Sequence, residues 1–392
     1  MRIRRAARTV LAAAIFSSAA APEALAIPAF ARKYQISCST CHSPFPRLKP
    51  FGEEFAAAGF RMPDPSQEPP RATIETGDPT LKLNRELPLA MRMDGFVQWT
   101  ENAPASTDMQ FPWVAKLLSG GPIASSVSYY LYAIFEEGEF KGLEDAYLYF
   151  GSPFGLPVDL GVGQFQVCDP LFKRELRLER FDYQIFKTHV GRARVDLTYD
   201  RGIFLGWTFP GDVDALLQVV SGNGIEAAQE WGGFDSDSHK NLSLRLARMF
   251  GKKLRLGVFG YWGREDGETG ETNQTTYLGP DLVLDLGANW QLNAQYLERR
   301  DDNPDFESDP EETFATRGGF AELHFFPRGP DGPWALSALY NRIDSDDDAA
   351  KYHSVSLTLN RLLARNVRLA FEAGRELEHE DGRVSLGLIA AF

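Results

Sequence analysis

Apolar and polar residues alternate with a period of two along most of this chain, from Leu89 to the C-terminus. The apolar side chains of residues 89, 91, 93, 97 and 99 are separated by the polar side chains of Arg92, Asp94 and Gln98. The same alternation recurs at 286–296, 354–360 and 384–392. Successive side chains of a strand point to opposite faces, so each run predicts a strand with one apolar and one polar face. Strands of about ten residues that repeat in this way are typical of a transmembrane β-barrel around a watery interior.

A soluble β-sandwich or β-propeller is the alternative to a barrel, because these folds also contain alternating strands. Two features favour the barrel. Aromatic residues recur near the ends of predicted strands, as in the aromatic girdles of barrels: Trp99, Trp113, Tyr261, Trp262 and Trp334. The chain also ends on Phe392, and a terminal phenylalanine is typical of bacterial outer-membrane barrels. We therefore predict an all-β transmembrane barrel over residues 88–392.

The connections between the predicted strands indicate how many strands there are. Long acidic connections at 222–239, 263–274, 301–313, 344–350 and 376–382 alternate with tight turns near 210–212, 251, 285, 329–332 and 364. Earlier strands are expected near 88–99, 110–118, 123–136, 142–150 and 156–167. A strand at 194–199 would make the total odd, whereas single-chain bacterial barrels have even numbers. We therefore predict one long outer loop at 168–201 folded into the lumen, about sixteen antiparallel strands, and both termini in the periplasm.

The N-terminal residues follow a different pattern. Four arginines within the first eight residues precede an apolar stretch at 10–21, and Ala24-Leu25-Ala26 has the form of a signal-peptidase site. The apolar stretch is too short to span a membrane as a helix. We expect residues 1–26 to be a signal peptide that is removed on export.

Cys38-Ser39-Thr40-Cys41-His42 carries the strongest chemical signal in the chain. In a C-x-x-C-H motif the two thiols form thioethers with haem c, and the histidine becomes the proximal iron ligand. A redox dithiol or half of a zinc site is the alternative, but no second C-x-x-C occurs to complete a zinc site. We predict one haem c, attached to Cys38 and Cys41 and ligated by His42.

The segment around this motif is short. Pro50 suits the first turn of a helix, and apolar residues recur at helical spacing up to Gly59. These features predict a small helix at 50–58 that covers the haem, followed by a proline-rich linker at 60–79. A segment of this size cannot enclose a porphyrin alone. We expect the haem c segment and linker (27–80) to lie inside the barrel or at its periplasmic mouth, where the barrel completes the pocket.

Composition narrows the function. The chain has 392 residues, a formal net charge of −13 and three cysteines, and a mean hydropathy of −0.29. The negative charge argues against a nucleic-acid partner. Two cysteines assigned to haem leave only Cys168, which is expected to be a buried thiol rather than a redox centre. No G-x-S-x-G or comparable hydrolase motif occurs.

Other candidate residues carry weaker signals. Met62 is a candidate distal iron ligand, with packing against the haem edge as the alternative. Of the remaining histidines, His189 in the long loop is the best candidate. The basic residues of that loop suit haem propionates or an anion-selective constriction, unless they pair with the loop's own Glu175, Glu179 and Asp182. The acidic residues of 301–312 suit a landing zone for cations, with an ordinary solvated loop as the alternative.

Several motifs together resemble a known family. They are Ile27-Pro28-Ala29-Phe30-Ala31-Arg32-Lys33-Tyr34, Cys38–His42, Pro46-x-Leu48, Phe51-Gly52, Phe55 and Gly59-Phe60. This N-terminal segment is similar to that of the monohaem outer-membrane cytochrome–porin fusion proteins, which include Fe(II) oxidases of iron-oxidising bacteria. The barrel pattern resembles that family and the phosphate-selective porins O and P. The similarity of the N-terminal segment covers about 35 residues. The similarity of the barrel lies only in the pattern of its strands and in its length.

The resemblance implies an outer-membrane c-type cytochrome fused to a porin-like barrel. Such a protein carries electrons between an extracellular donor, with Fe(II) as one candidate, and a periplasmic electron-carrier cytochrome, and it contacts outer-membrane lipid. It is an electron-transfer protein, and a role as an Fe(II) oxidase is open. The alternative is a porin or structural barrel whose haem segment is a plug or sensor.

Overall fold

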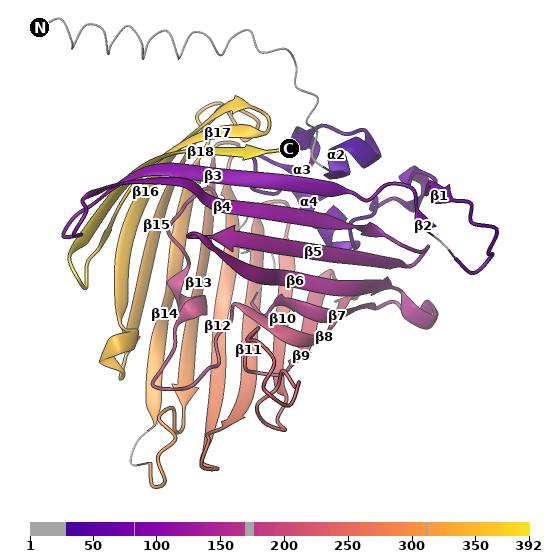
Figure 1. Cartoon of the computed structure of the whole chain (residues 1–392). Helices are drawn as coiled ribbons and strands as arrows, with labels where there is room; N and C mark the ends of the chain where they lie inside the picture. Colours follow the sequence, from indigo (N-terminus) through magenta and orange to yellow (C-terminus); the bar gives the residue numbers. More distant parts are fainter. Residues whose placement is uncertain (1–28, 82, 169–175, 311–312) are drawn as a thin grey trace, which may run out of the picture.

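The computed structural model describes residues 29–81, 83–168, 176–310 and 313–392, so the expected signal peptide (1–26) lies outside the described residues. In this part of the chain, sixteen antiparallel strands, β3 to β18, form a closed barrel (Figure 1). The last strand pairs with the first barrel strand from Arg383 opposite Thr100 to Ala391 opposite Arg92. This pairing closes the ring and leaves no open edge. The prediction of a barrel with about sixteen antiparallel strands is confirmed.

The first eight barrel strands are β3 (Leu89–Thr100), β4 (Thr107–Pro122), β5 (Val127–Glu136), β6 (Glu139–Gly151), β7 (Asp159–Gln166), β8 (Tyr199–Phe209), β9 (Val213–Val220) and β10 (Asn241–Phe250). The other eight are β11 (Leu254–Asp266), β12 (Thr272–Leu286), β13 (Trp290–Asp301), β14 (Phe314–Phe325), β15 (Trp334–Ser345), β16 (Tyr352–Ala364), β17 (Val367–Glu376) and β18 (Asp381–Ala391). Each strand is paired with its sequence neighbours throughout, as expected of an up-and-down barrel.

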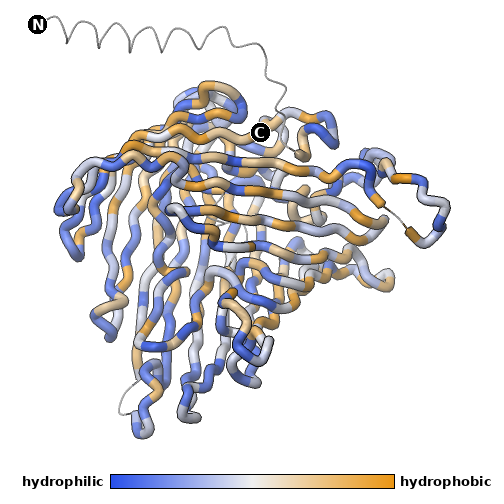
Figure 2. Tube along the Cα trace, in the orientation of Figure 1, coloured by the Kyte–Doolittle hydropathy of each residue, from blue (hydrophilic) through white to orange (hydrophobic). Residues whose placement is uncertain are grey.

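The alternation in the sequence corresponds to the two faces of the wall. On β16, Val355 and Leu357 are 45% and 55% exposed, whereas Ser356 and Thr358 between them are 3% and 1% exposed. The apolar side chains therefore point out of the barrel and the polar ones into it. Figure 2 shows this alternation along the strands, with hydrophilic loops at the end away from the C-terminus.

The connections divide the barrel into two ends. At one end, which we call the turn end, are the short connections 123–126, 152–158, 210–212, 251–253, 287–289, 326–333 and 365–366. The other, the loop end, carries the described residues of 167–168, 176–198, 221–240 and 302–310 and the remaining connections. The prediction of one long connection near 168–201 is confirmed. The expected loops at 263–274 and 376–382 are largely strand, because β11, β12, β17 and β18 extend into them and leave only 267–271 and 377–380.

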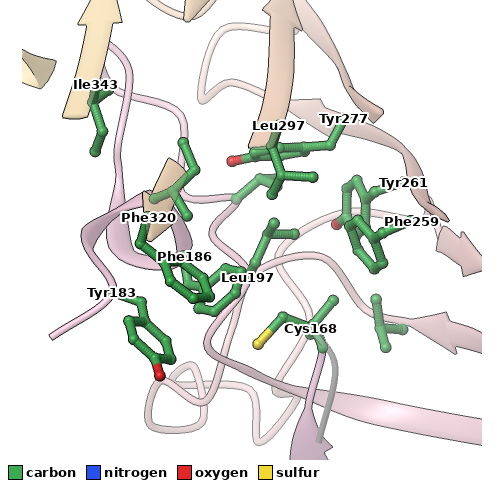
Figure 3. Close-up of a cluster of buried hydrophobic side chains, with 14 of the residues drawn as sticks. Cys168, Tyr183, Phe186, Leu197, Phe259, Tyr261, Tyr277, Leu297, Phe320 and Ile343 are labelled. Atoms are coloured by element: carbon green, nitrogen blue, oxygen red, sulfur yellow. The ribbon is translucent and has the colours of Figure 1, made fainter. Parts of the chain in front are cut away.

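The described part of the long connection from residue 176 onward folds back into the barrel, as predicted. Its short helix η6 (Gln184–Lys187) lies against β14 and β15. Its apolar side chains join a buried cluster with residues of the wall, among them Tyr183, Phe186, Leu197, Phe320 and Ile343 (Figure 3). The ring of Tyr183 stacks on that of Phe320 with centroids 3.7 Å apart. We call residues 176–198 the inner loop.

A buried arginine fixes the inner loop to the wall. Arg299 of β13 is completely buried and donates hydrogen bonds to the carbonyls of Thr188 (2.7 Å) and Val195 (3.1 Å). Its charge is paired with Asp301 at 2.6 Å. A buried charge is stable only when it is paired and fully hydrogen-bonded, and these contacts meet that condition.

The expected aromatic girdle is only partly correct. Trp99 and Trp262 are about half exposed, as expected of outward residues. Trp113 instead faces the interior, where its ring lies 3.9 Å from the guanidinium carbon of Arg180 in the inner loop. Tyr261 is 1% exposed within the interior cluster. Aromatic identity alone does not distinguish the two faces of a strand, because the inner loop supplies apolar surface inside the barrel.

Residues before the barrel form short elements: α2 (Ala29–Tyr34), α3 (Cys38–Cys41), α4 (Pro50–Ala57), η2 (Pro65–Gln67), β1 (Thr73–Ile74) and β2 (Leu83–Asn84). The remaining short helices are η3 (Pro153–Gly155) and η7 (Asp348–Ala350). The helix expected at 50–58 is confirmed as α4, with Gly59 at positive φ just after it. No helix in the described residues is long and apolar enough to cross a membrane.

The segment from α2 to η2, which we call the head, lies at the turn end of the barrel beside the C-terminus (Figure 1). Arg61 donates to the carbonyl of Ser125 in the β4–β5 turn (2.7 Å), and Lys49 pairs with Asp331 in the β14–β15 turn (2.6 Å). These turns belong to different sides of the ring of strands. The head therefore lies across the mouth of the barrel at the end that carries the short turns. This is one of the two positions that the sequence predicted for it.

Candidate functional site

The two cysteines lie on one short helical turn. Ser37 caps α3 by accepting a hydrogen bond from the Ser39 N–H (3.3 Å), and the N–H of His42 donates to the carbonyl of Cys38 (2.9 Å). His42 itself is extended (φ −118°), so the helix ends there. Residues three apart on a helix share a face. Cys38, Cys41 and His42 accordingly all line one cavity of about 850 Å³.

The ring of His42 is held by the backbone of the head. Its Nδ1 lies 2.8 Å from the carbonyl oxygen of Pro46. A carbonyl only accepts, so Nδ1 carries the proton and Nε2 is the nitrogen left to bind a metal. Burial lowers the pKa of His42, against the opposing effect of its backbone hydrogen bonds. The imidazole is therefore neutral at physiological pH, the form in which histidine ligates metals, with the second ring nitrogen oriented by a carbonyl.

The two thiols are also held in their neutral form. Burial raises the pKa of Cys41 to about 11, and the neighbouring Cys38 adds to the rise. Burial also raises the pKa of Cys38. Both side chains are thus protonated thiols at neutral pH, with no charge to be compensated inside the cavity.

Aromatic rings build the apolar wall of the cavity. Phe60 of the head stacks on Tyr130 of β5 with centroids 4.5 Å apart, and Phe30 stacks on Phe60 at 5.1 Å. Phe55 of α4 packs edge-on against Phe30 at 5.3 Å. All four residues line the cavity. Head and barrel therefore each supply part of one wall, as expected if the head is too small to enclose a large group alone.

Helix α4 lies directly against the haem-motif turn because residue 52 is a glycine. A Cβ at Gly52 would come within 2.5 Å of the carbonyl oxygen of Cys41 and 2.9 Å of Leu48 Cδ2. Neither contact is compatible with normal van der Waals packing, and the first involves backbone that cannot rotate away. The close approach of α4 to α3 thus depends on this one missing side chain.

We expect Gly52→Val to loosen the packing of α4 on α3 within the head. Overpacking of this kind costs about 1–3 kcal/mol. A loss near 1.4 kcal/mol raises the open population about tenfold, so limited proteolysis within residues 29–60 should be about tenfold faster. Glu54→Val is the control, because residue 54 is exposed on the same helix. Equal cleavage rates for the two variants would contradict the packing role of Gly52.

Basic side chains reach the cavity from the barrel wall. Arg92, Lys116, Arg245 and Arg255 line it, together with four acidic residues: Glu53, Asp145, Asp159 and Asp214. Arg92 is paired with Asp94 at 2.6 Å and Arg245 with Asp281 at 2.7 Å. The basic residues occupy inward positions of β3, β4, β10 and β11, so their signal in the sequence was a basic residue on the polar face of a predicted strand. Sequence reasoning missed them because the alternation does not say which strands surround the head.

One expectation was that the basic residues of the inner loop contact the haem propionates. Several of the described ones pair with acidic side chains instead. Arg177 and Lys187 both pair with Asp182, and Arg194 pairs with Glu265 of β11 at 2.5 Å. Of the described inner-loop residues, only Leu176 lines the cavity. The alternative, in which these charges stiffen the loop, therefore fits the described residues; Lys173 and Arg174 lie outside them.

The weaker candidates lie apart from the motif. Met62 packs on the aromatic cluster of Tyr34, Phe55 and Tyr130 and is not among the described residues that line the cavity, so its role as a distal ligand stays a prediction. His189 lies 3.6 Å from Asp196 in the inner loop. Cys168 is 1% exposed, as predicted, and its thiol accepts a hydrogen bond from Gln166 (2.9 Å).

Only some of the acidic side chains in the connection at 301–312 are exposed. Asp301 is buried and pairs with Arg299, so it belongs to the interior rather than to a cation landing zone. Asp302, Glu307 and Asp309 are exposed at the loop end. Glu311 and Glu312 lie outside the described residues.

Known structures resemble this chain in its barrel. An anion-selective porin from Comamonas acidovorans superposes with a TM-score of 0.58 at 11% identity, covering 78% of this chain and 99% of that one. The outer membrane channel DcaP of Acinetobacter baumannii gives 0.53 at 12% identity, with coverages of 78% and 97%. Salmonella typhi OmpF, in complex with daunomycin, gives 0.55 at 11% identity with the same coverages. No family model and no curated protein matches the sequence. The likeness establishes a porin-like fold.

The residues present fit a haem c. Two thiols and a neutral imidazole face one cavity, the imidazole has one nitrogen engaged and the other available, and aromatic rings form the wall. The cavity volume of about 850 Å³ is in the range of small-molecule sites.

Proposed function

We propose that this chain is a c-type cytochrome built into an outer-membrane barrel, which carries electrons between a donor outside the cell and a periplasmic cytochrome. One observation carries the proposal: Cys38, Cys41 and His42 line the same cavity, and the Pro46 carbonyl fixes the His42 tautomer. Those are the parts required for thioether attachment and proximal ligation. A bound haem would supply one-electron exchange in this cavity.

The protein's own residues have three roles in this proposal. Cys38 and Cys41 attach the cofactor, and His42 ligates its iron through Nε2. Phe60 and Tyr130 exclude water from the cavity, which raises the reduction potential of a buried haem.

The exposed acidic residues at the loop end fit the donor side. Asp302, Glu307 and Asp309 give that end a local negative charge, which concentrates cations such as Fe²⁺ by steering. The outer-membrane location, its lipid contacts and the periplasmic partner belong to the same proposal. They are supported by the porin-like fold, the apolar outer face and the export signal in the sequence.

The alternative function is a porin or structural barrel, which the fold likeness to porins favours. The two functions differ in what crosses the membrane. Vesicles that contain the full chain and a trapped soluble cytochrome c separate them when an impermeant reductant, or Fe²⁺, is added outside. Reduction of the trapped cytochrome that disappears in the Cys38→Ala, Cys41→Ala variant supports electron transfer. Solute conductance without such reduction would support the porin instead.

Topology is testable on whole cells. An epitope tag within residues 302–313 should be accessible to antibody from outside, whereas a tag within residues 210–212 should be accessible only after the outer membrane is permeabilised. The reason is that long loops of such barrels face outward and short turns face the periplasm. The reverse pattern of labelling would place the head outside the cell and refute the proposed direction.

A further inference from the structure

A second group of ligand-type side chains lies inside the barrel, away from the haem motif. It consists of Glu179 of the inner loop and of Glu322 and His324 of β14. One ligand atom from each of the three lies within 4.8 Å of the others. The three residues are 8%, 1% and 2% exposed. Neither cysteine of the motif nor His42 belongs to this group, so it is independent of the proposed function.

The group is held by neighbouring polar side chains. Tyr183 donates to Glu322 Oε2 (2.8 Å), and the Asn293 amide donates to the same oxygen (2.9 Å). His324 Nε2 lies 2.9 Å from that oxygen, and Nδ1 lies 2.8 Å from the hydroxyl of Ser337. These contacts orient the two side chains of β14 toward Glu179.

Two carboxylate oxygens of the group have no hydrogen-bond partner. They are Glu179 Oε1 and Glu322 Oε1, on side chains that are each at least nine-tenths buried. Glu179 Oε1 lies 3.8 Å from His324 Nδ1, so it is directed into the group. Leaving a buried polar atom unsatisfied costs about 1–3 kcal/mol, and more for a charged group. Two buried carboxylates in contact also repel each other unless a proton or a cation lies between them.

We propose that Glu179, Glu322 and His324 bind one divalent transition-metal ion. Carboxylate oxygens together with an imidazole nitrogen form a ligand set that favours Zn²⁺, Fe²⁺ or Mn²⁺ over Ca²⁺ and Mg²⁺. The ion satisfies both unpartnered carboxylate oxygens at once. Because Glu179 comes from the inner loop and the other two ligands from the wall, the ion also links the loop to β14.

Zinc is the probe for the test. The full chain, stripped of metal with a chelator, is equilibrated with Zn²⁺ in detergent, and bound metal is measured by mass spectrometry and calorimetry. The Cys38→Ala, Cys41→Ala, Cys168→Ala background removes competing thiols. We expect one zinc ion per chain, and binding at least about 100-fold weaker in Glu179→Gln and His324→Gln.

Glu265→Gln is the matched control. Glu265 is 3% exposed and also holds the inner loop, through the N–H and side chain of Arg194. A general loosening of the loop would weaken binding equally in this variant, whereas the proposal expects unchanged binding. Zinc bound equally by wild type and both ligand variants, or no stoichiometric zinc at all, would overturn the proposal in favour of a proton shared by the two carboxylates.

X-ray absorption of the zinc-loaded protein decides the matter if a ligand variant fails to form the barrel. The expected first shell contains only nitrogen and oxygen at about 2.0–2.2 Å, including one imidazole. A shell that contains sulfur, or no imidazole, would refute the site even though zinc was bound.

Discussion

Replacing Cys38 and Cys41 with alanine is expected to abolish covalent haem completely, so that the denatured chain no longer gives a haem stain on a gel. Thioether bonds to these two sulfurs are the only covalent link in this type of site. The barrel should still form, because the cysteines lie in the head and contribute to no strand pairing. Resistance of the folded barrel to detergent at room temperature measures this second expectation.

The chain provides a control for this result in its third cysteine. Cys168→Ala should keep the full haem stain, because Cys168 is buried in the cluster between the inner loop and the wall and does not line the cavity. Haem stain that persists in the double variant would refute the assignment of the motif. Loss of stain in Cys168→Ala alone would instead make the inner loop part of the haem site.

Expressing residues 27–80 without the barrel should expose the haem and lower its reduction potential. In the whole chain, Tyr130, Tyr132 and Tyr147 of the barrel complete the cavity wall beside Phe60. The fragment lacks these rings and the basic side chains that accompany them. A solvent-exposed haem stabilises its charged oxidised form, so the potential falls. Potentiometric titration of the two proteins, followed by haem absorbance, measures the difference.

A single substitution in the full chain provides an intermediate case. Tyr130→Ala removes the ring that stacks on Phe60 at 4.5 Å but leaves the basic residues in place. Its potential should shift in the same direction as that of the fragment, by a smaller amount. A fragment whose spectrum and potential match those of the full chain would mean that the head and the barrel are independent units. The shared cavity would then have no role in setting the potential.

Much of the fold was predictable because it rests on local patterns. A period of two over residues such as Val355 to Leu359 defines both the strand and its outward face. The even number of strands then assigned residues 168–201 to one connection, and the structure has no strand between Gln166 and Tyr199 among the described residues. The haem motif was equally local, since its chemistry depends on spacing within five residues.

Other expectations failed where position in space mattered. Trp113 and Tyr261 have the residue types of a girdle but face the interior, where the inner loop provides apolar partners. Asp301 has the composition of an acidic outer loop but is paired inside the barrel with Arg299. Residue type and sequence position do not reveal which surface an insertion into the lumen will cover.

The sequence by itself determined that the chain forms a barrel of alternating strands, that one long connection enters the lumen, and that Cys38, Cys41 and His42 form one local turn. Only the tertiary structure decided what surrounds that turn. The cavity combines the head with side chains of β3, β4, β10 and β11, and the Glu179–Glu322–His324 group joins residues distant in the sequence. Such sites depend on which strands and loops the closed barrel brings together. Local patterns in the sequence, such as alternation and short motifs, do not contain that information.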